Sequence, residues 1–236
     1  MAVAALPQAY PERFRYYDIL VSAFVAVLLI SNIVAPKIVS IGGVEFSGAQ
    51  ILFPITYIFG DIFTEVYGYA GSRRAIWNGF FANALLAGLS LIIVAMPAAP
   101  GWPHQAAYQT VLGFIPRLVI ASLIAYWVGE FVNSYVMARM KVLTGGKHLW
   151  MRTIGSTALG QAVDTVLVIV LAFGGIWPID QMLRVIAAGY VGKVLYEIAA
   201  TPVTYLVINA LKRAEKIDII DRNTDFNPFK TAIAEK

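Results

Sequence analysis

The chain has no cysteine, only two histidines and few charged residues. Asp, Glu, Lys and Arg make up 14% of its 236 residues, whereas soluble domains carry about 25%. The missing cysteines exclude disulfides, thiolate metal sites and a cysteine nucleophile. The histidines, His104 and His148, fall in opposite loops and are not expected to share a site. The chain also lacks HExxH, GxSxG, CxxC and Walker motifs, so we predict neither an enzyme nor a bound cofactor.

Apolar residues are abundant instead. They make up 59% of the chain, and the mean hydropathy is +0.70. About 20 consecutive apolar residues can cross a bilayer as a helix. We therefore predict an all-α, polytopic membrane protein that forms one domain over residues 1–236, with tails at 1–17 and 212–236. Six stretches are predicted to be transmembrane helices: 19–36, 49–67, 75–96, 118–138, 153–177 and 186–211.

The basic residues favour one orientation of these helices. With six spans and a cytoplasmic N-terminus, 14 of the 18 Lys and Arg residues fall on the cytoplasmic side and three on the outer side, while Lys193 falls inside the sixth span. Because cytoplasmic loops are enriched in Lys and Arg, this asymmetry supports six spans with both termini in the cytoplasm. The net charge of +4 then reflects topology, and we predict no nucleic acid partner. The first 18 residues lack the features of a cleaved signal peptide, so we expect the first span to be retained.

The loop between the first two spans has the pattern of a short hairpin. In KIVSIGGVEFSGAQ, alternating apolar residues flank Gly42 and Gly43. This pattern predicts a β-hairpin or a re-entrant turn at the outer face. An ordinary loop is the alternative.

Asp61 and Glu65 lie one helical turn apart within the apolar stretch 53–68. A charged side chain at the bilayer centre costs about 2.5 kcal/mol or more, and residues four apart share a helix face. We interpret this face as a polar seam that faces a cavity between helices. The alternative is that the membrane-embedded part ends near Gly60 and that both acids lie among the headgroups.

Polar side chains recur in the later spans. Glu130 and Asn133 share one face of the fourth span, and Gln161 and Asp164 are three residues apart in the fifth. Such spacings bring side chains together on a helix surface. Together with the seam of the second span, these residues can form a polar column through the bundle.

Several of these residues also have simpler explanations. Lys193 and Glu197 are four apart in the sixth span and could form an intrahelical ion pair. Asn32 and Asn83 could instead hydrogen-bond between helices, an interaction worth about 0.6 kcal/mol on average. Five buried acids against one buried base are nevertheless hard to explain by packing. An organic solute fits the mixture of acids, amides and aromatics better than the acidic ring of a cation channel does.

Five segments carry a family resemblance when they are taken together. They are FPITYIFGDIFTEVYG at 53–68, RRAIW at 73–77, RTIGSTALGQAVDTV at 152–166, GKVLYEIAATPVTY at 192–205 and FNPF at 226–229. In this order they resemble the queuosine precursor transporters, a family also described as vitamin uptake transporters. The resemblance implies uptake across the inner membrane of 7-cyano-7-deazaguanine and 7-aminomethyl-7-deazaguanine. It also implies six helices, similar to the substrate-binding subunits of energy-coupling-factor vitamin importers, and transport without an ATPase.

The polar and aromatic side chains of the predicted spans suit a guanine-like solute. Its ring N–H and exocyclic amine suit a carboxylate, since charge-assisted hydrogen bonds are strong, and its flat face suits an aromatic side chain. The candidate substrate-binding residues are Asn32, Gln50, Phe53, Tyr57, Gln161, Asp164, Lys193 and Glu197. The candidates for a gate or a proton path, which we expect in the inner half, are Asp61, Glu65, Arg74, Glu130 and Asn133.

The predicted partners are a small purine-like solute and the lipid bilayer, and a homo-oligomer is left open. The proton is the candidate coupling ion, with facilitated diffusion as the other route. An alternative function is the substrate-capture subunit of a vitamin importer that requires an energising partner.

Overall fold

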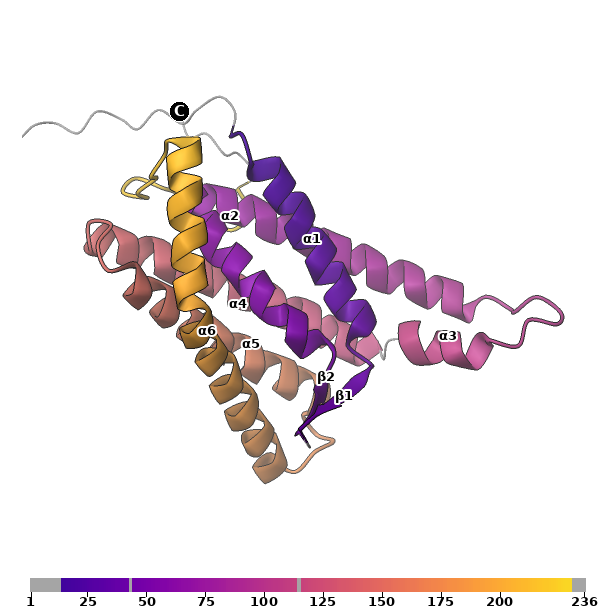
Figure 1. Cartoon of the computed structure of the whole chain (residues 1–236). Coiled ribbons are helices and arrows are strands. Elements are labelled where there is room, and N and C mark those ends of the chain that lie inside the picture. Colours follow the sequence, from indigo (N-terminus) through magenta and orange to yellow (C-terminus); the bar gives the residue numbers. More distant parts are fainter. Residues whose placement is uncertain (1–13, 43, 114–115, 231–236) are drawn as a thin grey trace, which may run out of the picture.

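The protein is a helical bundle with one short hairpin. The computed structural model describes residues 14–42, 44–113 and 116–230. Five segments in this part of the chain are long and apolar enough to cross a membrane, in agreement with the predicted all-α polytopic protein. The elements are α1 (Tyr17–Val34), β1 (Ile38–Ile41), β2 (Val44–Ser47), α2 (Ala49–Ala95), α3 (Gln105–Leu112), α4 (Pro116–Leu143), α5 (Leu149–Phe173) and α6 (Ile179–Glu215) (Figure 1).

The predicted hairpin is confirmed. Strands β1 and β2 pair antiparallel, with Ile38 opposite Ser47 and Ile41 opposite Val44. Gly42 has φ of 59°, a conformation that glycine adopts without steric cost. Ser47 Oγ donates to the Ala35 carbonyl at 2.7 Å and so ties the hairpin to the end of α1. We call the end of the bundle that carries β1, β2 and α3 the hairpin end.

Helix α2 differs from the prediction. The sequence predicts two spans, 49–67 and 75–96, joined by a basic loop, but α2 is helical on both sides of Gly68 and bends at that residue alone. Its first arm runs from the hairpin toward the C-terminal segment, and its second arm runs away from that segment toward α3 (Figure 1). Gly68 has φ of 73° and ψ of 176°, a region of backbone conformation essentially restricted to glycine. One residue thus reverses the chain, and Arg73 and Arg74 are helical.

Replacing Gly68 with alanine is expected to destabilise the protein. The Cβ would lie 2.8 Å from Ile219 Cγ2, in a backbone conformation that costs a non-glycine residue about 1–3 kcal/mol. Thermal unfolding of the purified variant in detergent should occur at a lower temperature than in the wild type. Gly88→Ala is the matched control, because Gly88 lies in the second arm of α2 with no atom within 4 Å of its would-be Cβ. An unchanged unfolding temperature for Gly68→Ala would contradict the strained turn.

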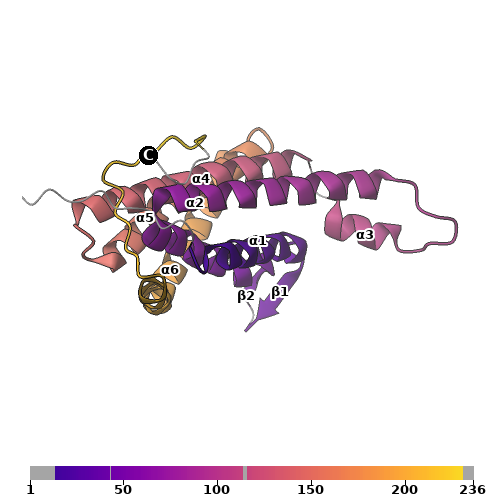
Figure 2. The same ribbon diagram turned by 90° about the horizontal axis from the view of Figure 1, so that it is seen from above.

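The segment after α6 packs against the bend of α2. We call residues 216–230 the C-terminal strap. It runs from the end of α6 past the bend to α4 (Figure 2). The Asp221 carboxylate accepts from the backbone N–H of Tyr69 at 3.1 and 3.2 Å, and Ile219 is buried beside Gly68. The sequence predicts only a polar tail here, so this docking is a new finding.

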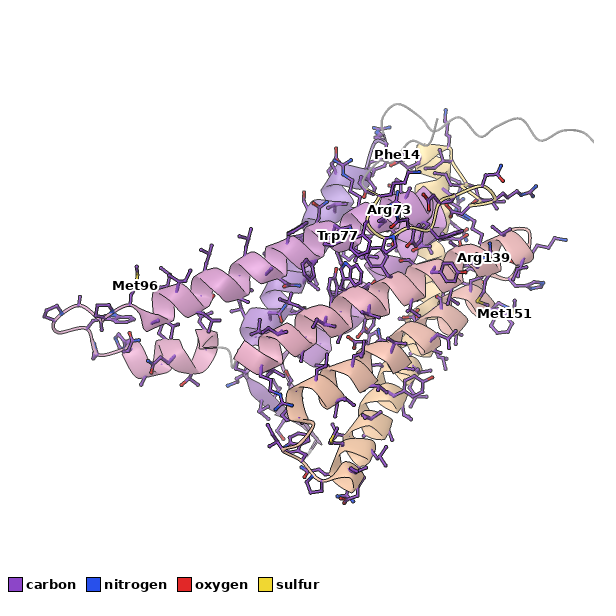
Figure 3. The ribbon with its side chains drawn as sticks, turned by 180° about the vertical axis from the view of Figure 1, so that it is seen from behind. Phe14, Arg73, Trp77, Met96, Arg139 and Met151 are labelled. Carbon is purple, nitrogen blue, oxygen red and sulfur yellow. The ribbon has the colours of Figure 1, made fainter. Side chains whose placement is uncertain are left out.

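The second arm of α2 holds the rest of the strap. Arg73 Nη1 donates to the carbonyls of Asp225 and Asn227 at 3.1 and 2.9 Å. Trp77 Nε1 donates to the Pro228 carbonyl at 2.7 Å. Figure 3 shows Arg73 and Trp77 on the face that the strap crosses. Aromatic rings complete the contact, with Phe226 against Tyr69 and Tyr135, and Phe229 against Trp77 and Trp127.

Two glycines bring α4 and α5 together where polar side chains lie. A Cβ at Gly129 would fall 2.8 Å from the Asp164 Cβ, and one at Gly160 would fall 2.8 Å from the Asn133 Cβ. The helices therefore meet at their glycines, and side chains larger than hydrogen would push them apart. Glu130 and Asn133 of α4 are thereby held beside Gln161 and Asp164 of α5.

Candidate functional site

A cavity of about 560 Å³ opens between the long helices. Thr110 and Val111 of α3 line it at the hairpin end, and Glu130 and Gln161 line it near the middle of α4 and α5. Most ligand sites for small molecules fall between about 300 and 1,000 Å³. Five of the predicted substrate-binding residues line this cavity: Asn32, Tyr57, Gln161, Asp164 and Lys193.

The remaining candidates divide differently from the prediction. Glu130, which the sequence analysis assigned to the gate, lines the cavity. Glu197 is not among the described residues that line it and is buried, with 1% of its surface exposed. The side chains of Gln50 and Phe53 lie outside the described part of the structure.

Lys193 and Asp164 form an ion pair across the cavity wall. Lys193 Nζ lies 2.7 Å from Asp164 Oδ2 and donates to Thr165 Oγ1 at 3.3 Å. The pair joins α6 to α5, so the alternative of an intrahelical pair between Lys193 and Glu197 is wrong. Because both side chains stay about one quarter exposed, the pair is reachable from the cavity.

The Glu130 side chain of α4 packs against the first arm of α2 at Gly60. Its Oε2 lies 3.0 Å from the position that a Cβ on Gly60 would take, so an alanine there would press against the carboxylate. Lys193 and Asp164 are among its electrostatic neighbours. Tyr57, one turn before Gly60, lies beside Gln161. Glu130, Tyr57 and Gln161 thus present an acid, a phenol and an amide to one space.

Asn32 and Asn83 face each other at the cavity wall. Asn32 Nδ2 donates to Asn83 Oδ1 at 2.9 Å and to the Leu28 carbonyl at 3.0 Å. The hydrogen bond joins α1 to the second arm of α2, as the interhelical alternative predicts. Both residues also line the cavity, so the bond does not remove them from it.

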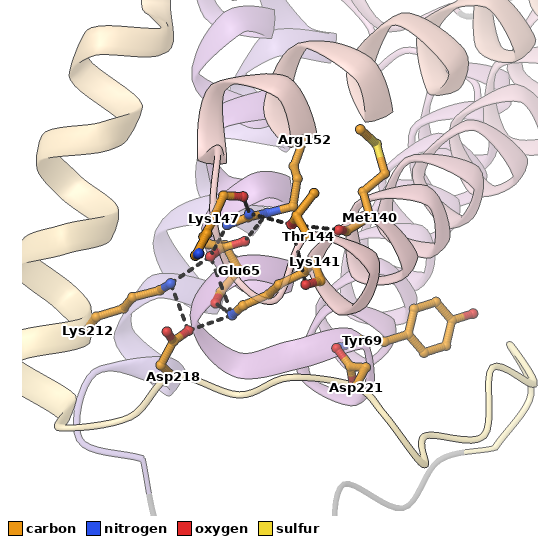
Figure 4. Close-up of polar contacts among 10 residues, drawn as sticks. All are labelled: Glu65, Tyr69, Met140, Lys141, Thr144, Lys147, Arg152, Lys212, Asp218 and Asp221. Carbon is orange, nitrogen blue, oxygen red and sulfur yellow. Dashed lines mark hydrogen bonds and ion pairs between the residues drawn. The ribbon is translucent and has the colours of Figure 1, made fainter.

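Glu65 lies at the centre of a buried ionic cluster. It is fully buried, and Figure 4 shows basic side chains from three other helices converging on it. Arg152 donates to both carboxylate oxygens, at 3.2 and 2.8 Å. Lys212 Nζ lies 2.6 Å and Lys141 Nζ 3.4 Å from Glu65 Oε1. We call Glu65, Lys141, Arg152, Lys212 and Asp218 the Glu65 cluster, and the end of the bundle that carries it the charged end.

Asp218 extends this cluster into the strap. Its Oδ1 lies 2.7 Å from Lys141 Nζ and 2.8 Å from Lys212 Nζ. Partial burial opposes ionisation of Asp218, but the hydrogen bonds and charges of the two lysines outweigh it and lower its pKa. The cluster therefore links α2, α4, α5 and α6 to the strap.

The sequence analysis missed the partners of Glu65. It assigned the basic residues at the span ends to topology and placed Arg74 below the acids. In the structure Arg74 is exposed and lies over the Tyr17 ring at 6.0 Å. The available signal was that Lys141, Arg152 and Lys212 all fall within a turn or so of a predicted span end.

Asp61 and Glu197 lie between the cavity and the Glu65 cluster. Asp61 is one turn from Tyr57 and one turn from Glu65 along α2, and Glu197 is one turn from Lys193 along α6. Asn133 of α4 lies beside Asp61. All three are buried.

A family model covers most of this architecture. The model described as "Putative vitamin uptake transporter" matches residues 47–207, from β2 into α6. The chain belongs to this family. It is a transporter with a helical, multi-pass membrane architecture, and the family's function implies a small-molecule substrate.

Two relatives carry a more specific name. The chain is 27% identical over 187 residues to the "Probable queuosine precursor transporter" of Bacillus subtilis, covering 79% of this chain and 82% of that protein. It is 26% identical over 147 residues to the "Queuosine precursor transporter" of Escherichia coli, covering 62% and 64% of the two chains. No solved structure matches the chain.

Proposed function

We propose that this transporter imports the queuosine precursors 7-cyano-7-deazaguanine and 7-aminomethyl-7-deazaguanine. The observation that carries the proposal is the cavity, in which Glu130, Gln161 and Tyr57 face one space beside the Lys193–Asp164 pair. The relatives named as queuosine precursor transporters support the same solute class.

The cavity residues suit a flat, guanine-like ring. A carboxylate can accept hydrogen bonds from the ring N–H and the exocyclic amine together. Of the described acids that line the cavity, Asp164 has a lysine at ion-pair distance and Glu130 does not. The Gln161 amide can donate to the ring oxygen, and the Tyr57 ring can stack on the base. Asp164 and Lys193 would then either bind the substituent at position 7 of the deazaguanine ring or, as an ion pair, join α5 to α6 at the cavity wall. The roles of Asn32, Gln50 and Phe53 stay predictions.

We further propose that the two arms of α2 each cross the bilayer, which gives six crossings. The basic residues of the Glu65 cluster and the strap lie at the charged end, as expected of the cytoplasmic side of a bacterial inner membrane. Both termini would then be cytoplasmic. Residues of α3 line the cavity at the hairpin end, which would face outward in this orientation, while the Glu65 cluster would close the cytoplasmic side.

Transport without an ATPase, with the proton as coupling ion, is part of the same proposal. The alternative is a substrate-capture subunit, similar to those of energy-coupling-factor importers, that needs an energising partner. A homo-oligomer is compatible with either.

Uptake by the protein alone separates these proposals. Purified chain in liposomes is expected to take up radiolabelled 7-cyano-7-deazaguanine without any other protein, and guanine and riboflavin serve as comparison solutes. Ligand-dependent thermal stabilisation in detergent measures binding separately. Binding without uptake would favour the capture subunit, whereas failure to bind either deazaguanine would refute the proposed substrate.

A further inference from the structure

Two acids on one face of α2 have opposite surroundings. Glu65 is neutralised by three basic side chains, at 2.6 to 3.4 Å. Asp61, one turn earlier, is equally buried, yet no hydrogen bond reaches either of its carboxylate oxygens from the described part of the chain. A buried carboxylate without a compensating charge or donor is unstable as an anion. The contrast indicates that Asp61 is neutralised by a group other than the described side chains.

Glu197 of α6 is the immediate neighbour of Asp61. The charges of the two carboxyl groups act on each other, and both oxygens of Glu197 also lack a hydrogen bond from the described residues. Ionised carboxylates only accept hydrogen bonds, and two like charges that share a buried site favour protonation of one of them. Asn133, whose buried Oδ1 is likewise unpaired in the described structure, lies beside Asp61.

The charged groups around this pair do not supply its neutralisation. Glu65 of α2 and Glu130 of α4 face Asp61, and both are acids. Lys193 of α6 and Asp164 of α5 act on Glu130, but Lys193 is already paired with Asp164. Lys141, Arg152 and Lys212 of the Glu65 cluster are bound to Glu65.

Building on the proposed function, we propose that Asp61 and Glu197 form a proton-binding site whose single shared proton is carried inward with the solute. The pair lies between Glu130, which lines the cavity, and Glu65, which closes the charged end. A proton enters from the cavity side through Glu130 and bridges the two carboxyls. It leaves toward the charged end when the cations of the Glu65 cluster separate from Glu65.

The test uses the purified full-length chain in liposomes with the inner and outer pH set independently. For one proton per solute molecule, an inward gradient of one pH unit supports about tenfold accumulation. The wild type is expected to accumulate 7-cyano-7-deazaguanine to this extent. Asp61→Asn and Glu197→Gln, which keep the side-chain shape, are expected to lose accumulation and to retain solute exchange at equal pH. Asp180→Asn is the matched control on α6, because Asp180 is exposed and pairs with Arg184, which is exposed as well.

A second measurement does not depend on the solute. The infrared spectrum of the wild type should contain the C=O band of a protonated carboxylic acid, and each variant of the pair should lose it while Asp180→Asn keeps it. If the wild type binds no deazaguanine but shows this band, the proposed substrate fails and the proton site stands. Two outcomes would overturn the proton site: both variants keeping the band, or both accumulating solute as the wild type does.

A parallel experiment tests sodium as the coupling ion. Replacing choline chloride with sodium chloride outside the liposomes is expected to leave accumulation unchanged. Stimulation by sodium that disappears in Asp61→Asn and Glu197→Gln would replace the proton by sodium and would contradict the inference.

Discussion

Replacing Glu130 with glutamine is expected to weaken binding of 7-cyano-7-deazaguanine by about 10- to 100-fold, because a hydrogen bond to a charged group contributes about 1.5–3 kcal/mol. Glu130 lines the cavity beside Tyr57 and Gln161, and glutamine keeps its size while it removes the charge and one acceptor. The dissociation constant can be measured by titration calorimetry in detergent.

Two further variants sharpen this experiment. Asp180→Asn removes an exposed acid from α6 and should bind the solute as the wild type does. Asp164→Asn should also weaken binding, but it breaks the pair with Lys193 as well, so its effect includes a change in the cavity wall. Normal affinity in Glu130→Gln together with lost affinity in Asp164→Asn would move the contact with the guanine edge to Asp164.

Replacing Glu65 with glutamine is expected to have the largest effect on stability. The change leaves Lys141, Arg152 and Lys212 converging on a neutral amide, and breaking a buried ion pair from one side costs about 3–5 kcal/mol. The free energy of unfolding, measured in detergent with increasing sodium dodecyl sulfate, should fall by this amount.

Asp218→Asn is the comparison for that prediction. Asp218 contacts two of the same lysines, but its side chain is 51% exposed, and an exposed pair contributes at most about 1 kcal/mol. We therefore expect a small loss. Equal losses in Glu65→Gln and Asp218→Asn would show that burial of the cluster does not determine its strength.

The sequence predicted the parts of this fold that depend on local composition. Apolar length located the helices, and the alternation around Gly42 located the hairpin. It did not predict the bend of α2, because Arg73 and Arg74 after Gly68 have the composition of a loop. The strap packs against this helical turn, and two of its carbonyls accept from Arg73. Contacts across about 150 residues of sequence leave no local pattern.

The sequence indicated the position of the candidate site better than the position of each side chain within it. Four of the candidate substrate-binding residues, Tyr57, Gln161, Asp164 and Lys193, line the cavity. The position of a residue along a span gives no information on which way its side chain points around the helix. For that reason the sequence did not predict that Glu130 lines the cavity or that Glu197 lies beside Asp61. The close contacts of Gly129 and Gly160 fix the rotation of α4, and so of Glu130, against α5, and a sequence alone does not show which glycines meet.

The strap also has a consequence for biosynthesis. Chains are made from the N-terminus, and their parts fold in that order. Residues 216–230 follow every long helix, so α2 leaves the ribosome well before the groups that hold its bend, including the Asp221 carboxylate and the carbonyl partners of Arg73. During synthesis the two arms of α2 are thus free to insert one after the other. The bend is secured only once the last helix is in place, so the strap is the final step of assembly.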